Sequence, residues 1–92
     1  MKLNEQIKAL AELDGRMIKW KDGDHWVEAK YKDFPDEWYI PSSDPRNYLT
    51  SYDAIIPLIQ KHWSACGYHV SLRDKPIELS EALLRATGKW KD

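Results

Sequence analysis

The dipeptide Asp22-Gly23 is the feature that most restricts the fold, because it lies between two runs with the composition of β-strands. A two-residue type I′ turn needs positive φ at both central positions, and Asp-Gly is a preferred pair there. The turn predicts a hairpin in which Lys21 pairs with Asp24. Side chains alternate between the two faces of a strand, so one face of this hairpin is apolar and the other mostly polar. The apolar face holds Ile18, Trp20, His25, Val27, Ala29 and Tyr31, and the polar face holds Lys19, Trp26, Glu28 and Lys30.

Three helices are predicted around this hairpin. Apolar residues recur at helical spacing through residues 3–14, and Gly15 takes the position where a left-handed residue ends many helices. A second helix is predicted over residues 51–66. The third begins with Pro76, whose missing N–H costs nothing in a first turn, and ends at Gly88.

The second helix has two unusual features. Thr50 or Ser51, followed by Asp53, fits the pattern of a capping box at its start. Pro57 removes one backbone hydrogen bond from its interior, at a cost of about 3 kcal/mol if unrelieved, and predicts a kink. The stripe expected to face the core consists of Tyr52, Ile56, Ile59, Trp63 and Cys66.

Two further strands are predicted outside the hairpin. Residues 38–40 form a short third strand that ends at Pro41, and residues 68–72 alternate apolar and polar side chains as a fourth would. The element order is α-β-β-(β)-α-β-α. We therefore expect an α+β fold, in which a small antiparallel sheet of three to four strands packs with three helices as a single domain over residues 1–92.

The balance of charge narrows the classes of partner. The chain has 14 Lys and Arg against 15 Asp and Glu, so its net charge is -1. Proteins that bind duplex nucleic acid usually carry a basic excess, since contacts to phosphate drive that binding. No apolar run reaches the roughly 18 residues that span a bilayer, and the polar N-terminus does not resemble a signal peptide. We therefore expect a cytoplasmic protein that binds neither duplex nucleic acid nor a membrane.

Catalytic and metal-binding chemistry is not predicted. Ser51 beside Asp53 would act as a nucleophile only with a neighbouring base, and no His or Lys lies at a recognisable motif spacing. The three histidines come from different elements, at spacings that no metal motif uses. Cys66 lies on the predicted buried stripe, where a thiol is inert, and as a single cysteine it cannot form an internal disulfide. We expect no enzymatic activity, no cofactor and no metal.

The distribution of aromatic residues suggests binding. Trp26 falls on the polar face of the hairpin, Trp38 lies near a turn, and Trp90 follows the last helix. Exposed aromatic residues beside Arg or Lys are typical of protein interfaces and of base-stacking surfaces, although a domain this small also needs aromatics for its core. The candidate ligand- or partner-binding residues are Trp26, Trp38, Tyr39, Arg46, Tyr48, Asp53, Arg85, Lys89 and Trp90.

Parts of the chain resemble a known group of proteins. These parts are Trp20-Lys21 before the turn, NYLTSYDAIIPLIQK at residues 47–61 and EALLRATGKWKD at residues 81–92. Together they resemble small bacteriophage and prophage proteins similar to the phage α/β (ABA) sandwich domain group. The resemblance implies a phage-encoded accessory protein that acts in the host cytoplasm, and it assigns no catalytic residue.

Three non-enzymatic functions are compatible with these features. In the first, the protein is a counter-defence inhibitor that binds a host protein through the aromatic and acidic residues around 33–39. In the second, it sequesters a nucleotide-like small-molecule signal in an aromatic and cationic pocket, with a homo-oligomer interface as one place for that pocket. In the third, it is a structural or regulatory phage protein without a host target. The residues considered for the pocket are Trp26, Arg46, Tyr48, Arg85, Lys89 and Trp90.

Overall fold

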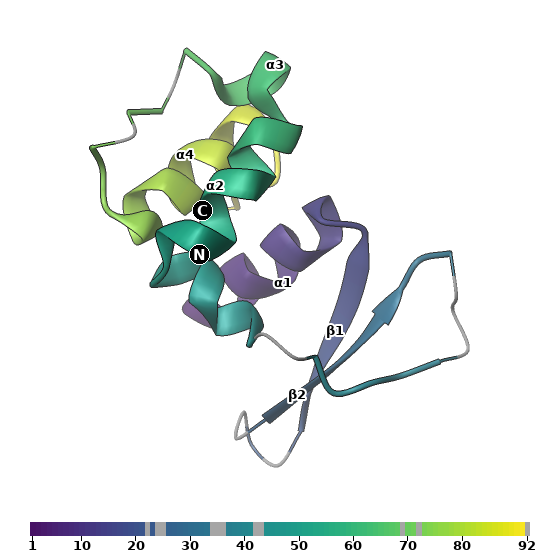
Figure 1. Cartoon of the computed structure of the whole chain (residues 1–92). Helices are drawn as coiled ribbons and strands as arrows, with labels where there is room; N and C mark the ends of the chain where they lie inside the picture. Colours follow the sequence, from purple (N-terminus) through teal and green to yellow (C-terminus); the bar gives the residue numbers. More distant parts are fainter. Residues whose placement is uncertain are drawn as a thin grey trace.

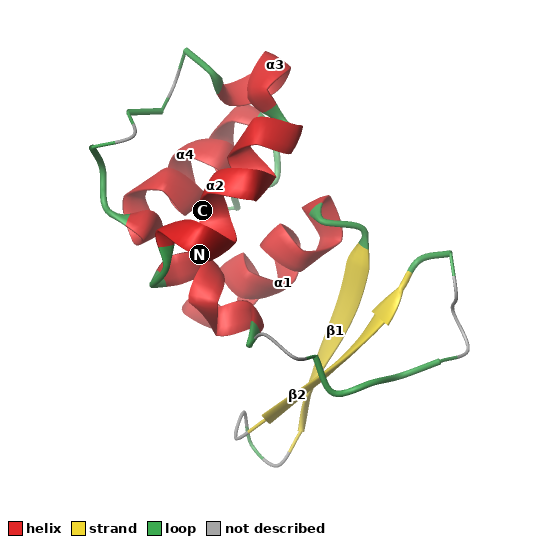
Figure 2. Ribbon diagram, viewed as in Figure 1, coloured by secondary structure: helices red, strands yellow, loops and turns green. Residues whose placement is uncertain are grey.

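The computed structural model describes residues 1–21, 23, 26–33, 37–41, 44–68, 70–71 and 73–91, with only the backbone at residue 26. The fold is α+β, as predicted. The helices gather on one side and an antiparallel hairpin projects away from them, with β1 against α1 (Figures 1 and 2). The elements are α1 (Leu3–Leu13), β1 (Arg16–Lys21), β2 (Trp26–Tyr31), the 3-10 helix η1 (Pro45–Leu49), α2 (Tyr52–Lys61), α3 (Trp63–Cys66) and α4 (Pro76–Ala86).

The hairpin forms, but its predicted register is wrong. Lys21 pairs with Trp26 rather than with Asp24. Four residues therefore separate the paired ends of the strands, whereas the predicted type I′ turn has two. The observed register places Lys19 directly opposite Glu28, a favourable cross-strand pair of opposite charges. Because the shift is an even number of residues, the described side chains of the two strands keep their predicted faces. The apolar face accordingly supplies the buried residues Ile18, Val27 and Ala29.

The strands predicted beyond the hairpin are not confirmed. Tyr39 forms a single antiparallel bridge with Ala29, in which each N–H donates to the other residue's carbonyl at 2.8 Å. Pro41 then removes a donor two residues later. The residues described between 68 and 72 form no strand, and the N–H of Asp74 turns back to the carbonyl of Ser71 at 2.9 Å. His69 and Leu72 lie outside the described residues.

The second predicted helix is in fact two helices. His62 has φ -113° and ψ 26°, outside the helical range, so α2 ends at Lys61 and α3 begins at Trp63. The ring Nε2 of His62 lies 3.1 Å from the carbonyl oxygen of Leu13, the last residue of α1. The interruption therefore provides a polar contact between the end of α2 and the end of α1.

The start of α2 also differs from the predicted capping box. Ser51 is the N-cap residue, so the third helical residue is Ala54 and not Asp53. A capping box needs an acid at that third position, and the side chain of Ser51 makes no capping hydrogen bond. Asp53 still lies in the first turn, where the helix dipole favours a negative charge. Pro57 lies within α2 on its exposed side.

The buried side of α2 is rotated from the predicted stripe. Two members of that stripe, Tyr52 and Trp63, are exposed. Because the chain leaves the helical path at His62, Trp63 does not continue the spacing of α2. Ile59 and Cys66 are buried as predicted. The buried side of α2 consists of Ile55, Leu58 and Ile59.

Glycines end α1 and α4 where predicted. Gly15 and Gly88 have φ values of 78° and 74°, in the left-handed region. At the end of α4 the N–H of Gly88 donates to the carbonyl of Arg85 at 3.2 Å, and that of Lys89 donates to the carbonyl of Leu84 at 2.8 Å. These are the two hydrogen bonds of a Schellman motif, which needs a left-handed residue at this position.

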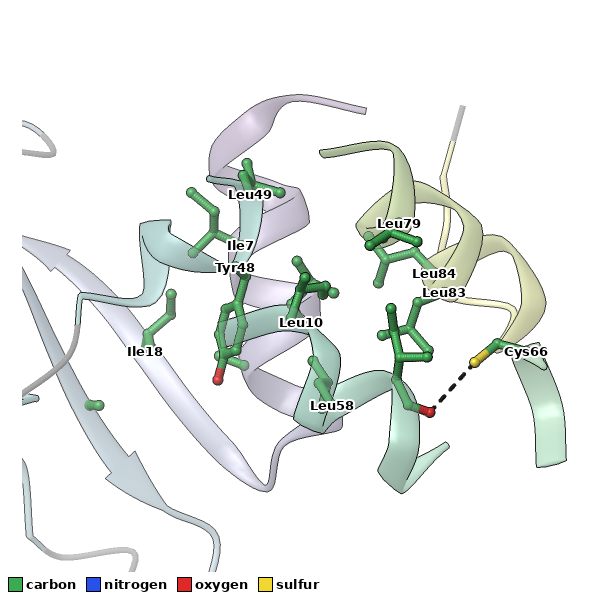
Figure 3. Packing of buried hydrophobic residues seen from close by; sticks show 14 of the residues in the cluster. Ile7, Leu10, Ile18, Tyr48, Leu49, Leu58, Cys66, Leu79, Leu83 and Leu84 are labelled. Atoms are coloured by element: carbon green, nitrogen blue, oxygen red, sulfur yellow. Dashed lines mark hydrogen bonds between the residues drawn. The ribbon is translucent and has the colours of Figure 1, made fainter. Parts of the chain in front are cut away.

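The core lies between the helices and the apolar face of the hairpin (Figure 3). Full burial of one Leu or Ile side chain contributes about 1.5–3 kcal/mol, so a cluster of this size supplies most of the driving force for folding. Among the described residues of the hairpin, three belong to this cluster and Trp20 packs against it. The buried cluster comprises Ile7, Leu10, Ala11, Ile18, Val27, Ala29, Tyr48, Leu49, Ile55, Leu58, Ile59, Cys66, Leu79, Leu83 and Leu84.

Candidate functional site

The face of the hairpin that points away from the core carries its described charged side chains, apart from Arg16. Strand alternation places these residues opposite the buried set, and Trp38, from the segment that follows the hairpin, lies over two of them. The backbone of Trp26 shares this face by register, but its side chain lies outside the described residues. We define the outer face as Met17, Lys19, Lys21, Glu28, Lys30 and Trp38.

Two lysines from different strands meet at the ring of Trp38. The Nζ atoms of Lys19 and Lys30 lie 4.1 Å and 4.6 Å from the centroid of the indole. Both distances are within the roughly 6 Å range of a cation–π interaction, worth about 0.5–1 kcal/mol at an exposed site. Trp38 nevertheless keeps 37% of its surface exposed. The indole thus contacts two lysines while part of Trp38 remains exposed.

The outer face is locally basic, although the whole chain is nearly neutral. Oε2 of Glu28 lies 3.3 Å from Nζ of Lys19 and 4.0 Å from Nζ of Lys21. Two lysines therefore share this one glutamate, and Lys30 adds a third positive charge to the outer face. Exposed ion pairs of this kind contribute only about 0–1 kcal/mol, so a partner's carboxylate can compete for these lysines at little cost.

A polar cluster behind the hairpin joins it to η1. The hydroxyl of Tyr48 donates to Oδ2 of Asp14 at 2.7 Å, and the guanidinium of Arg16 donates to the same hydroxyl. Arg16 also lies 3.4 Å from Oδ2 of Asp14. Burial, together with the hydrogen bond to Asp14, raises the pKa of Tyr48 to about 12, so the phenol is neutral at physiological pH. Tyr48, a predicted binding residue, is only 4% exposed and is a structural contact here.

Tyr39 points to the opposite side of its segment from Trp38, as strand alternation requires. Its ring stacks on Tyr31, with 5.3 Å between the centroids. Its hydroxyl is buried, and this burial raises the pKa of Tyr39. Of these two neighbouring candidates, Trp38 therefore contributes to the outer face and Tyr39 to the packing of the hairpin.

The structure brings one further pair of predicted residues together. The guanidinium carbon of Arg85 lies 4.7 Å from the ring centroid of Trp90. Lys89, the residue before Trp90, is exposed. Arg46 lies on η1, where its Nε donates to Oδ2 of Asp44 at 2.8 Å. That contact with Arg46 lowers the pKa of Asp44.

His62 and Cys66 are the only described residues of the types considered for a soft metal site. Among the described residues, no group of three or more His, Cys, Asp or Glu side chains is arranged to hold an ion. His25 and His69 lie outside those residues. Cys66 is fully buried, with its Sγ 3.7 Å from the carbonyl oxygen of Ile59 (Figure 3), and burial raises the pKa of its thiol.

Sequence reasoning missed two exposed aromatic residues in the helical part besides Tyr52, which was expected to face the core. Trp63 is 51% exposed and borders a groove with Ile56 and Gln60, and Tyr68 is fully exposed. Both follow the interruption at His62, which the helical pattern does not reveal. The contact of Trp38 with the lysines was also missed, although the sequence placed Lys19 and Lys30 together on the polar face of the hairpin.

Comparisons with known proteins do not assign a family. The chain matches no protein-family model, and no curated protein or solved structure is significantly similar to it. In the part of the chain that the structure describes, no helix has the length and apolar character to cross a bilayer. The function is therefore argued from the outer face itself.

Proposed function

We propose that this is a non-enzymatic accessory protein, encoded by a phage or prophage, that binds a host protein through the outer face of the hairpin. The observation that carries the proposal is the partly exposed indole of Trp38, held between Lys19 and Lys30. Tryptophan is enriched among the residues that dominate the free energy of protein–protein binding. A side chain already fixed in position also loses less conformational entropy when a partner binds.

The shape of the molecule supports the same assignment. The hairpin projects from the helices, so a partner can approach the outer face without meeting them (Figure 1). The hairpin also contributes few buried residues, and its outward side chains are not needed to form the core. The residues proposed to bind a partner can therefore differ from those that form the core.

The biological setting of the proposal rests on the sequence. Residues 47–61 and 81–92 carry the resemblance to phage and prophage proteins, and that origin makes inhibition of a host defence component in the cytoplasm the favoured role. Neither Ser51 nor Asp53 has a hydrogen-bonded base among the described residues, which favours binding over catalysis.

A second candidate function is sequestration of a nucleotide-like signal. The stacked pair of Arg85 and Trp90 supports it, since such pairs also bind anionic aromatic ligands. Tyr48, by contrast, is buried with Asp14 and Arg16 and cannot line an open pocket in this conformation. Host-protein binding therefore remains the better-supported proposal. A rise in melting temperature with a nucleotide panel, lost in Trp90→Ala, would favour sequestration.

Affinity capture from host lysate with three forms of the protein tests the proposal. Wild type and Trp63→Ala should retain the same host protein, whereas Trp38→Ala should lose it. Trp63 is a matched control because it is an exposed tryptophan of the helical part. The captured protein is then purified and its affinity for each form measured directly. Equal affinity for wild type and Trp38→Ala would rule out the outer face as the binding surface.

A further inference from the structure

The segment that carries Trp38 has one edge bonded to the hairpin and one edge open. Tyr39 uses both its N–H and its C=O in the bridge to Ala29. In an extended chain the backbone groups of adjacent residues point to opposite sides. The N–H and C=O groups of Trp38 and Ile40 therefore point away from β2.

The groups on this open edge have no partner within the described part of the chain. No backbone hydrogen bond joins residue 38 or 40 to another described residue. Ile40 is 74% exposed, and this segment runs along the side of the hairpin away from the helices (Figure 1). Trp, Tyr and Ile all favour strands. Residues 38–40 therefore have the composition of a strand, although they form only a single bridge with the described part of β2. A strand added at this edge would supply the missing hydrogen bonds.

The charge of the outer face selects the chemistry of that added strand. Strand alternation places Ile40 on the same side as Trp38 and Glu37 on the opposite side, and the bridge between Ala29 and Tyr39 sets Trp38 beside Lys30 and Ile40 beside Glu28. Alternate side chains of an added strand would lie beside Trp38 and within reach of Lys30. The outer face carries three lysines and one glutamate, so acidic side chains fit there and basic ones are repelled.

A second copy of the chain fits this edge less well. Two copies paired edge to edge about a two-fold axis would bring their lysine-rich outer faces onto one side of a continuous sheet. Like charges on one face oppose such pairing, which is how many edge strands avoid self-association.

We infer that residues 37–41 bind an extended acidic segment of a partner protein, which adds to the open edge as a strand. Main-chain hydrogen bonds to Trp38 and Ile40 would supply affinity, and contacts with Trp38 and the lysines would supply specificity. The inference rests on the proposed function, because it specifies how the partner reaches the same surface.

Selection from a library of random linear peptides, with the immobilised full chain as target, tests this inference. The selected peptides should be rich in alternating Asp or Glu. Ile40→Pro removes the outward N–H and should weaken their binding by about ten-fold, the effect of one lost hydrogen bond with its acceptor left unpaired. Ile40→Ala keeps the N–H and should weaken binding by less than about three-fold. Unchanged circular dichroism spectra and melting curves would show that both variants fold.

The other outcomes overturn the inference in distinguishable ways. Failure to select peptides, peptides without acidic residues, or equal binding to Ile40→Pro and wild type would each exclude an added acidic strand. If those peptides or the captured host protein still require Trp38, the outer face remains the binding surface and only the added strand is wrong. If Trp38→Ala has no effect either, the proposed function fails too. A dimer that Ile40→Pro dissociates would assign the edge to a second copy instead.

Discussion

The helical part and the hairpin use similar residue types for different purposes. In the helical part the apolar residues interlock in one core, to which the hairpin adds only Ile18, Val27 and Ala29. On the outward side of the hairpin lie three lysines, two of which contact the partly exposed ring of Trp38. If the protein binds as proposed, stability and binding depend on separate sets of side chains, which substitutions can test one at a time.

The largest effect should come from a cavity in the helical core. Leu83→Ala removes a fully buried side chain and should lower the free energy of unfolding by about 2–5 kcal/mol. Urea unfolding followed by circular dichroism measures this loss. Met17→Ala, on the outer face, is the control and should change stability by less than about 0.5 kcal/mol. Similar losses in the two variants would remove the distinction between the two regions.

The next largest effect is expected where the two regions meet. Tyr48→Phe deletes the hydroxyl that bonds Asp14 and Arg16 and leaves those charged groups short of a partner. We expect a loss of about 1–3 kcal/mol in the free energy of unfolding. An unchanged value would show that the cluster does not join the hairpin to the helices.

The raised pKa of the Tyr48 hydroxyl should make the stability of the fold depend on pH. The folded pKa of Tyr48 is about 12, against an ordinary value of 10.0, so between these values the unfolded chain loses a proton that the folded chain keeps. Stability conferred by this group is fully present below pH 10 and declines as the pH rises toward 12. The stability difference between wild type and Tyr48→Phe should therefore shrink over this range. Tyr68→Phe, which alters a fully exposed tyrosine, is the control.

A smaller effect is expected at the end of α4. Gly88 has φ 74°, so Gly88→Ala places a side chain in the left-handed region and should cost about 1–2 kcal/mol. Thermal unfolding measures the shift. Gly88→Asn should recover part of the loss, because asparagine tolerates this conformation better than alanine. Equal losses for Ala and Asn would indicate that the conformation at this position is not the cause.

The smallest effect on stability should come from Trp38, the residue on which the proposed binding depends. Trp38→Ala removes contacts with two exposed lysines and should cost about 0.5–1 kcal/mol. Calorimetric unfolding measures the stability, and affinity for the captured host protein measures the binding. A much larger loss of stability would mean that Trp38 belongs to the core and would blur the contrast between the two regions.

Much of the fold could be predicted from local patterns. The glycines at positions 15 and 88 ended helices as expected, and Pro76 began one, because these depend on the conformation of one or two residues. The faces of the hairpin followed from alternation. Its register did not, since cross-strand pairs and a longer connection outweighed the preference of Asp-Gly for a tight turn.

The parts that failed depend on contacts between distant segments. His62 interrupts the second predicted helix where its ring meets α1, and no spacing within residues 51–66 reveals that contact. Trp38 was a candidate because of its neighbours in sequence, but Lys19 and Lys30 come from two other strands. Tyr48 was a candidate for the same reason as Trp38, and only tertiary packing distinguishes the buried residue from the exposed one.

The buried thiol of Cys66 provides a reporter for the helical part alone. It is the only cysteine in the chain, it is fully buried, and burial raises its pKa, so a thiol-specific reagent must wait for the surrounding packing to open. The rate of alkylation under native conditions therefore counts openings of the packing around α2, α3 and α4. Substitutions on the outer face should leave this rate unchanged, whereas Leu83→Ala should increase it.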